Sequence, residues 1–259
     1  EMCIRDSAWG LGYFGQPHIV TRFMALRSAS EAKAGRRTGI IWVTICFAGA
    51  VFTALVSTVY FGTTSATVTD QNGFETIFLD LARLLFHPLV AGIILTAVLA
   101  AIMSTMSSQL LITSSALIED LYRIFKKEPS QTTLLVLSRL MVVLVAVVAM
   151  LLALNPSDTI LGLVGFAWAG FGAAFGPVVL ASLYWRRLTA PGALAGMIVG
   201  AVTVFVWGTY FGDIIYEIVP GVAFATIAMV AVSLATTPKP GVEEEFDRVT
   251  GNQEALPAV

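Results

Sequence analysis

The sequence predicts an all-α polytopic membrane protein, on three observations. The chain has 259 residues, of which 57% are hydrophobic and only 12% are charged, and its mean hydropathy is +0.83. These values lie far from those of a soluble globular domain. Apolar residues gather in runs long enough to cross the hydrocarbon of a bilayer, which takes roughly 20 residues in a helix. Basic residues lie in alternate connections between these runs, as they do in multi-pass membrane proteins.

The first apolar segment, Ala8 to Thr21, is too short to span intact and contains helix-breaking residues. Its stretch from Trp9 to His18 reads WGLGYFGQPH, with three glycines and one proline. An interrupted helix is tolerated in a membrane only where protein buries it or where it lines a cavity, because unpaired backbone groups are costly in lipid. Secondary transporters build substrate sites from such helices. We therefore expect the remaining part of a helix that lines a binding site.

Six further segments are apolar and long enough to span a bilayer as helices. They are Gly39 to Phe61, His87 to Ser115, Thr133 to Leu154, Thr159 to Trp185, Thr189 to Gly212 and Ile214 to Ala235. The spans Thr159 to Trp185 and Thr189 to Gly212 contain many glycines, and Gly192, Gly196 and Gly200 recur at a spacing of four. This spacing is typical of helix faces that pack closely, an interpretation we favour over a gating role.

The basic residues predict the orientation of these segments. Cytoplasmic loops are enriched in Lys and Arg. Basic residues follow the first, third and fifth segments and recur in the tail: Arg22, Arg27, Lys33, Arg36, Arg37, Arg123, Lys126, Lys127, Arg139, Arg186, Arg187, Lys239 and Arg248. The connections at 62–70, at 155–158 and around Asp213 hold almost none, and only Arg5 and Arg83 depart from the pattern. The first segment is therefore predicted to run from outside to inside, with a cytoplasmic C-terminus.

The stretch from Phe74 to Phe86 has apolar residues at helical spacing with charged residues between them. This pattern predicts an amphipathic helix, which the topology places on the extracellular face. Two interpretations stand equally: a lid over an outer vestibule, or an interfacial helix that covers its neighbours.

The two ends of the chain differ in character from the rest. Residues 1–7 (EMCIRDS) are charged, lack the apolar core of a signal peptide and join directly onto membrane sequence. We expect them to be extraneous and the chain to be a C-terminal fragment of a longer protein. A transmembrane domain is expected at 8–235, and a cytoplasmic tail at 236–259. Two prolines and an acidic run at 243–247 predict that this tail is disordered.

No enzyme signature is present, so we expect a protein that is not an enzyme and has no cofactor. The chain has no His/Cys cluster with metal-ligand spacing and no paired carboxylates in a soluble cleft. Gly10, Gly12 and Gly15 match the spacing of a nucleotide-binding fingerprint. No strand or βαβ unit precedes them, and we interpret the match as a false positive.

A cation site in the spans is predicted to use neutral oxygens. Almost no ionisable residue lies within the spans, whereas proton-coupled carriers usually keep a buried Asp, Glu or His. Ser104 and Thr105, with the carbonyl of Ala101 one turn earlier, can direct oxygens toward a hard monovalent cation. The alternative, which the residues alone favour, is that these hydroxyls bond to neighbouring helices or to carbonyls of their own helix.

A substrate site is predicted at Trp9 and Tyr13, which are four residues apart and share one face if the turn between them is helical. A small zwitterionic or apolar solute can stack on such rings, while a half-helix N-terminus binds its carboxylate. The alternative, of about equal weight, is that both are interfacial belt residues. Pro17 contributes to the break by removing a backbone donor.

Four stretches of the chain resemble the sodium:solute symporter family. They are Trp9 to His18, Leu99 to Leu111 (LAAIMSTMSSQLL), Ala167 to Val178 (AWAGFGAAFGPV) and Gly192 to Val202 (GALAGMIVGAV). The resemblance extends from about Ala8 to Ala235. The first two stretches are specific, whereas the glycine-rich ones alone are not.

The resemblance implies a leucine-transporter-like inverted-repeat fold, of which this chain holds the second repeat plus two C-terminal helices. These correspond to helices seven to thirteen of the family's thirteen. It further implies that Trp9, Tyr13 and Pro17 bind L-proline and that Ala101, Ser104 and Thr105 bind sodium. The missing first six helices supply other sodium ligands and part of the pocket, so the fragment alone is not expected to transport.

The function implied by the resemblance is sodium-coupled import of L-proline by alternating access. Sodium is the coupling ion, the lipid bilayer is the other partner, and no nucleic acid is expected. The implied location is the bacterial cytoplasmic (inner) membrane, with multiple passes. Alternatives are a sodium symporter of the same fold for another solute, such as pantothenate or another amino acid, and a transporter-like membrane sensor domain.

Overall fold

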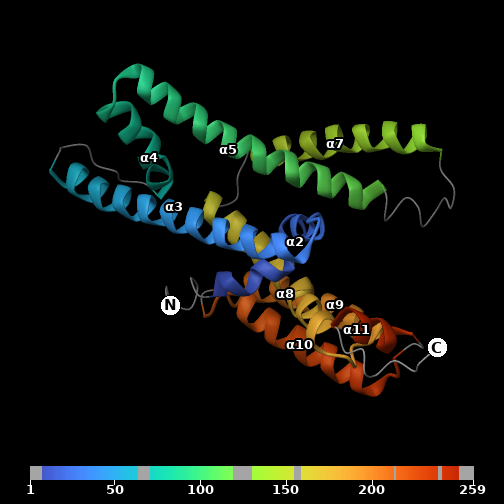
Figure 1. Ribbon diagram of the computed structural model, residues 1–259. Helices are drawn as coiled ribbons and strands as arrows, with labels where there is room; N and C mark the ends of the chain where they lie inside the picture. Colours follow the sequence, from blue (N-terminus) through green and yellow to red (C-terminus); the bar gives the residue numbers. More distant parts are fainter. Residues whose placement is uncertain are drawn as a thin grey trace. The chain divides into compact units, whose positions relative to one another are not determined.

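The computed structural model describes residues 8–63, 71–118, 130–154, 159–212, 214–238 and 241–250, and within these ranges the chain forms helices and short connections (Figure 1). Contacts divide the chain into two compact units, residues 1–24 with 161–259 and residues 25–160, and each unit is described by itself. Predictions for the other positions, including the extraneous segment 1–7 and most of the connections between spans, lie outside the described residues.

In the unit of residues 25–160, the described helices are α3 (Ala29–Thr63), α4 (Gln71–Leu85), α5 (Pro88–Ser115) and α7 (Gln131–Ala153). Helix α5 contacts both α4 and α7. The starts of α5 and α7 are capped by side chains. The His87 Nδ1 atom accepts a hydrogen bond from the Leu89 amide, and the Ser130 hydroxyl accepts one from the Thr133 amide. Caps of this kind satisfy amide groups that have no partner in the first turn.

All six predicted spans are helices of membrane-spanning length and hydropathy, so this prediction is confirmed. Four of them begin within two residues of the predicted position, and two begin farther from it. Helix α3 begins at Ala29 rather than Gly39, because the preceding residues are rich in Ala, Glu, Lys and Arg, which favour helix without being apolar. Helix α10 begins at Ile218 rather than Ile214, because the carbonyl of Ile215 accepts a hydrogen bond from the Trp207 indole outside the helix.

The amphipathic helix predicted at Phe74 to Phe86 is confirmed as α4. Leu81 and Ala82 on its apolar face are buried, and the helix contacts α3 and α5 of its own unit. This packing matches the interpretation of α4 as a helix that covers its neighbours. Its position on the extracellular face and a role as a lid stay predictions.

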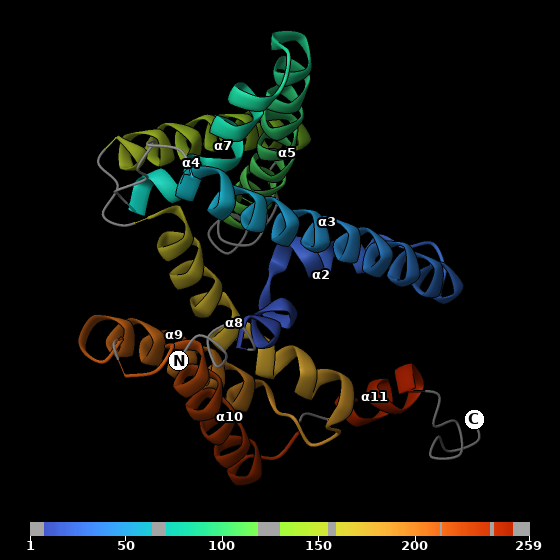
Figure 2. The same ribbon diagram turned by 90° about the vertical axis from the view of Figure 1, so that its left-hand side faces the viewer.

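The other unit holds the interrupted segment and the C-terminal helices. Residues 8–12 are helical, and η1 (Tyr13–Gly15) and α2 (Pro17–Met24) follow. The C-terminal part consists of α8 (Ile160–Tyr184), of which all but the first residue belongs to this unit, α9 (Ala190–Tyr210), α10 (Ile218–Ala235) and α11 (Val242–Thr250). Figure 2 shows α9 and α10 side by side, in agreement with their extensive contacts.

The glycines at a spacing of four in α9 form a packing face, as predicted. A Cβ atom on Gly192 would lie 1.9 Å from the Ser233 hydroxyl of α10, and one on Gly196 would lie 2.9 Å from Cβ of Met229. Gly200 faces α8 instead, where its Cβ would lie 2.5 Å from the carbonyl oxygen of Ala173. These glycines therefore let three helix backbones approach each other closely.

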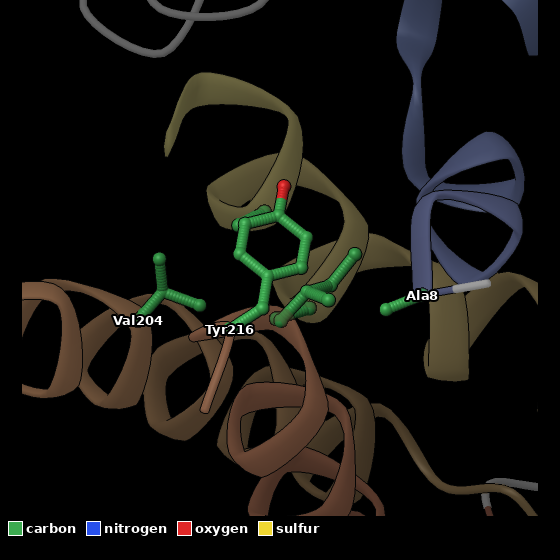
Figure 3. Packing of buried hydrophobic residues seen from close by; sticks show 6 residues of the cluster. Ala8, Val204 and Tyr216 are labelled. Carbon is green, nitrogen blue, oxygen red and sulfur yellow. The ribbon is translucent and has the colours of Figure 1, made fainter. Parts of the chain in front are cut away.

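A small apolar cluster joins the segment at Ala8 to α8, α9 and α10. It consists of Ala8, Ala169, Ala173, Val204, Tyr216 and Ile218. Figure 3 shows Ala8, Val204 and Tyr216 converging from their separate parts of the chain. The Tyr216 hydroxyl donates a buried hydrogen bond of 2.7 Å to the carbonyl oxygen of Gly165 in α8, so its polar atom is satisfied.

The prediction of a disordered tail is wrong for residues 242–250, which form α11. The Arg186 guanidinium donates a hydrogen bond of 2.7 Å to the carboxylate of Asp247, and the side chain of Asp247 is only 4% exposed. The carboxylate of Glu243 lies 3.5 Å from the same guanidinium. The acidic run has a fixed cationic partner after α8, which composition alone does not reveal. The cytoplasmic location of the tail stays a prediction.

We expect Gly200→Ala to destabilise the chain. The new methyl group would meet the Ala173 backbone at 2.5 Å, and neither backbone yields without separating α8 from α9. Overpacking of this kind costs about 1 to 3 kcal/mol. Gly170→Ala in α8 is the matched control, because no atom lies within 4 Å of its new Cβ. Thermal unfolding of the purified chain in detergent should show a lower midpoint for Gly200→Ala only. Equal midpoints for both variants would contradict the packing of α9 on α8.

We expect Asp247→Asn to release α11. Hydrogen bonds to charged groups contribute about 1.5 to 3 kcal/mol, so amide exchange across 242–250 should quicken by roughly tenfold or more. Glu244→Gln removes an exposed carboxylate from the same helix and should leave the exchange rate unchanged. Exchange measured by mass spectrometry tests both variants. Similar rates in the two would show that the Arg186 contact does not hold the helix.

Candidate functional site

The interrupted segment breaks at Gln16, within the stretch Trp9 to His18 for which the sequence predicts an interruption. The chain is helical at 8–12, tightens to a 3-10 turn at Tyr13–Gly15 and is extended at Gln16, with φ −84° and ψ 112°. An extended residue before proline is expected, because the proline ring disfavours the helical conformation there. Helix α2 then begins at Pro17. Proline has no amide hydrogen, but the first residue of a helix does not need one, because its amide has no partner within the helix.

Trp9 and Tyr13 share one face, as predicted, and a single indole of α8 contacts both. The ring of Trp168 stacks on Trp9 with centroids 5.3 Å apart, and meets the ring of Tyr13 edge-on at 4.9 Å. The Trp168 Nε1 atom donates a hydrogen bond of 3.0 Å to the carbonyl oxygen of Trp9. The two predicted substrate residues thus belong to a cluster of three aromatic rings.

Two of the three glycines in the segment are required by this contact. A Cβ atom on Gly12 would lie 2.1 Å from the Trp168 Nε1 atom, and one on Gly15 would lie 2.3 Å from the carbonyl oxygen of Phe171. Gly172 of α8 matches them, since its Cβ would lie 2.6 Å from the Cα atom of Gly12. Gly10 meets nothing within 4 Å. The indole of Trp168 therefore accounts for Gly12, and the close approach of the α8 backbone accounts for Gly15.

Gln16 and Trp168 are site residues that the sequence interpretation missed. The buried side chain of Gln16 donates a hydrogen bond of 3.2 Å from Nε2 to the carbonyl oxygen of Trp168. The Gln16 side chain thus donates to a backbone carbonyl of α8, and the Trp168 side chain donates to a backbone carbonyl of the interrupted segment. A signal was present in the sequence, because an amide or an indole N–H inside apolar sequence requires an acceptor.

The exposure of the rings distinguishes Tyr13 from Trp9. The Tyr13 side chain is half-exposed, Trp9 is half-buried and Gly12 beneath Trp168 is buried. Tyr13 is therefore held by its edge contact with Trp168 while much of its ring is open to a solute. An aromatic face of this kind suits an apolar ring or a cation.

A shallow apolar groove of about 250 Å³ lies on another side of the segment, between Leu11, α8 and α10. Gly176, Pro177, Leu180 and Met229 are among its lining residues. The hydroxyl of Thr226, also in the lining, donates a hydrogen bond to the carbonyl oxygen of Val222 of its own helix. The groove offers no charged group to a zwitterion, so we do not place the substrate there.

The candidate cation ligands lie along α5 in the other unit. The Thr105 hydroxyl donates a hydrogen bond of 3.3 Å to the carbonyl oxygen of Ala101, and the Ser108 hydroxyl donates one of 3.0 Å to the carbonyl oxygen of Ser104. The alternative interpretation, hydroxyls bonded to their own helix, therefore describes Thr105 and Ser108. The same geometry sets the Thr105 oxygen beside the Ala101 carbonyl. The hydroxyl keeps lone pairs for a cation while its proton is donated.

The structure thus brings Trp9 and Tyr13 together and, separately, Ala101 and Thr105. Pro17 follows the aromatic cluster as the first residue of α2, and its carbonyl oxygen accepts a hydrogen bond of 2.9 Å from the Thr21 hydroxyl. The substrate candidates belong to the unit of residues 1–24 and 161–259, and the cation candidates to that of residues 25–160.

Comparison with characterised proteins identifies close relatives. The high-affinity proline transporter PutP of Bacillus subtilis is 51% identical over 243 residues, which cover 93% of this chain and 51% of that protein. The sodium/proline symporters of Salmonella typhimurium and Escherichia coli are each 48% identical over 253 residues, covering 96% of this chain and 50% of theirs. The chain spans about half the length of these relatives. No solved structure matches it.

A sequence profile of one family also matches most of the chain. The profile is described as "Sodium:solute symporter family", and the match covers residues 1–200. This range includes the interrupted segment, the hydroxyl-rich part of α5 and the glycines at a spacing of four in α9. The chain therefore belongs to the sodium:solute symporter family, as an all-α polytopic membrane protein.

Proposed function

We propose that this chain forms half of a sodium-coupled carrier that imports L-proline by alternating access, and that it acts as a transporter rather than an enzyme. The observation that carries the proposal is the interrupted segment, whose Trp9 and Tyr13 rings both contact Trp168 of α8. The relatives named as proline transporters, each matched over most of this chain, support proline as the substrate. We further propose the cytoplasmic membrane as its location, with the C-terminus inside.

Recognition of proline would use both sides of the break. The methylene groups of the pyrrolidine ring are apolar and small enough to lie against the open face of Tyr13, and the ring's ammonium nitrogen carries the positive charge that an aromatic face attracts. The carboxylate carries the negative charge that the positive partial charge at the N-terminus of α2 favours. Pro17 has no amide hydrogen and the Ile19 amide donates to the carbonyl oxygen of Gln16, so this attraction comes from the helix dipole. Pro17 contributes by ending the upstream helix and starting α2. A broken helix thus supplies an aromatic face and an electropositive backbone end within one short segment.

Sodium would bind to neutral oxygens, among them the carbonyl of Ala101 and the hydroxyls of Ser104 and Thr105. Hard cations prefer oxygen ligands, and a monovalent ion does not require carboxylates on the same helix. Coupling follows if sodium and proline both bind better to the outward-open state. Each ligand then raises the affinity for the other by the same factor. After the carrier changes to the inward-open state, both ligands are released.

Replacing the two α5 hydroxyls should weaken sodium binding. We expect Ser104→Ala with Thr105→Ala in the full-length carrier to raise the sodium concentration for half-maximal uptake by roughly 10- to 100-fold, the loss expected for contacts to a charge. Thr96→Ala is the matched control, because the Thr96 hydroxyl bonds to the Gly92 carbonyl of the same helix. Uptake of radiolabelled L-proline is measured with sodium or choline in a strain without its own carriers. An unchanged sodium requirement in the double variant would exclude this site.

Removing the exposed ring should weaken proline binding. We expect Tyr13→Leu to raise the KM for proline by roughly two- to tenfold, since aromatic contacts contribute about 0.5 to 1.5 kcal/mol beyond the area they bury. Phe14→Leu removes an adjacent ring of similar exposure and should leave the KM unchanged. Competition by unlabelled pantothenate and other amino acids identifies a different solute. If wild-type protein at the membrane takes up no proline, the substrate assignment is wrong, and the sensor interpretation is then tested.

A further inference from the structure

Trp168 of α8 meets the interrupted segment through three different groups. Its ring contacts Trp9 and Tyr13, its indole N–H donates to the Trp9 carbonyl, and its own carbonyl accepts from Gln16. We propose that Trp168 is a positioning residue, which holds Trp9 and Tyr13 in the geometry that binds substrate. This inference rests on the proposed function of that pair and deepens it.

The segment needs support from outside because its own helix is interrupted. A break removes backbone hydrogen bonds at its two flanks, so the rings on either side of it are less constrained than in a continuous helix. When the side chains of a site are mobile, substrate binding has to order them, and this lowers the affinity. In a preorganised site the fold has already ordered them before the substrate binds. A large indole that contacts both rings fixes their distance and their relative tilt.

Several contacts hold Trp168 itself in place, so its position can determine the positions of Trp9 and Tyr13. The absence of a side chain at Gly12 leaves room for the indole directly over the backbone of the segment. Its N–H and its carbonyl are both satisfied by the segment, at Trp9 and Gln16. The neighbouring Ala169 is fully buried in the apolar cluster that joins α8, α9 and α10. The position of the aromatic pair is thereby tied to the packed helices.

Trp207 of α9 provides a matched comparison within the same unit. Its indole also donates to a backbone carbonyl, that of Ile215, at 3.2 Å. Its ring packs on Phe211 with centroids 5.3 Å apart. Replacing either tryptophan by phenylalanine therefore removes one indole-to-carbonyl hydrogen bond and keeps an aromatic ring. Only the replacement of Trp168 changes the support of Trp9 and Tyr13.

The experiment compares Trp168→Phe, Trp168→Leu and Trp207→Phe in the full-length carrier. For Trp168→Phe we expect a roughly two- to tenfold rise in the KM for proline, the size of one lost hydrogen bond. Trp168→Leu should raise the KM further, because the ring contacts are also lost. The kcat and the sodium dependence should change by less than about twofold. Trp207→Phe should leave the KM unchanged. Each value is normalised to the amount of carrier in the membrane.

A second measurement needs no substrate. Amide hydrogen exchange of residues 8–16 should quicken in both Trp168 variants and not in Trp207→Phe, because Trp168 holds the segment in the empty carrier. If exchange quickens while the KM stays constant, Trp168 supports the fold only and the positioning role is excluded. If exchange stays constant in Trp168→Phe and Trp168→Leu, the proposal is overturned outright. If Trp168→Leu does not reach the membrane, the KM and the exchange rate of Trp168→Phe alone test the positioning role.

The two measurements separate this inference from the proposed function. A wild-type carrier that takes up no proline contradicts the substrate assignment, whatever Trp168 does. The exchange measurement then still shows whether Trp168 fixes the segment, and constant exchange overturns that role. A carrier whose KM rises equally in Trp168→Phe and Trp207→Phe would show a general effect of tryptophan loss, and would overturn a specific role for Trp168.

Discussion

The close contact between the interrupted segment and α8 is the interaction on which the candidate substrate site depends. A broken helix in lipid must have its polar backbone groups satisfied by protein. Here Gly12 and Gly15 bring the segment onto the backbone of α8, and the side chains of Trp168 and Gln16 each donate to a carbonyl of the opposite element. The break is therefore a packed structure, and its aromatic pair has a defined position.

Small residues allow close approach of helix backbones throughout the unit of residues 1–24 and 161–259. Gly172 and Gly200 admit neighbouring backbones to α8 and α9, and Gly221 of α10 packs on Ala173 and Val204. Helix association in membranes gains little from the hydrophobic effect, so close van der Waals packing and a few hydrogen bonds have to stabilise it. The buried hydrogen bond from Tyr216 to the Gly165 carbonyl is one of these.

The helices of residues 25–160 pack differently. In the most apolar windows of α3, α5 and α7, at most 6% of the residues are buried within the structure, against 39% for α8. Large apolar surfaces of this kind are covered in a membrane protein by lipid or by other parts of the assembly. The hydroxyls of Thr105 and Ser108 in α5 meanwhile bond to carbonyls of their own helix, which satisfies them without a neighbouring helix.

The sequence by itself determined the helical class, the six spans, the interruption within Trp9 to His18 and the shared face of Trp9 and Tyr13. These features follow from composition and from spacing along the chain, which act locally. Only the tertiary structure decided that Trp168 and Gln16 complete the site, because their partners lie more than 150 positions away. It also decided that residues 242–250 form a helix, since the acidic run gains a fixed partner only where Arg186 meets it. Local pattern predicts elements, whereas contacts between distant residues depend on packing that no local pattern encodes.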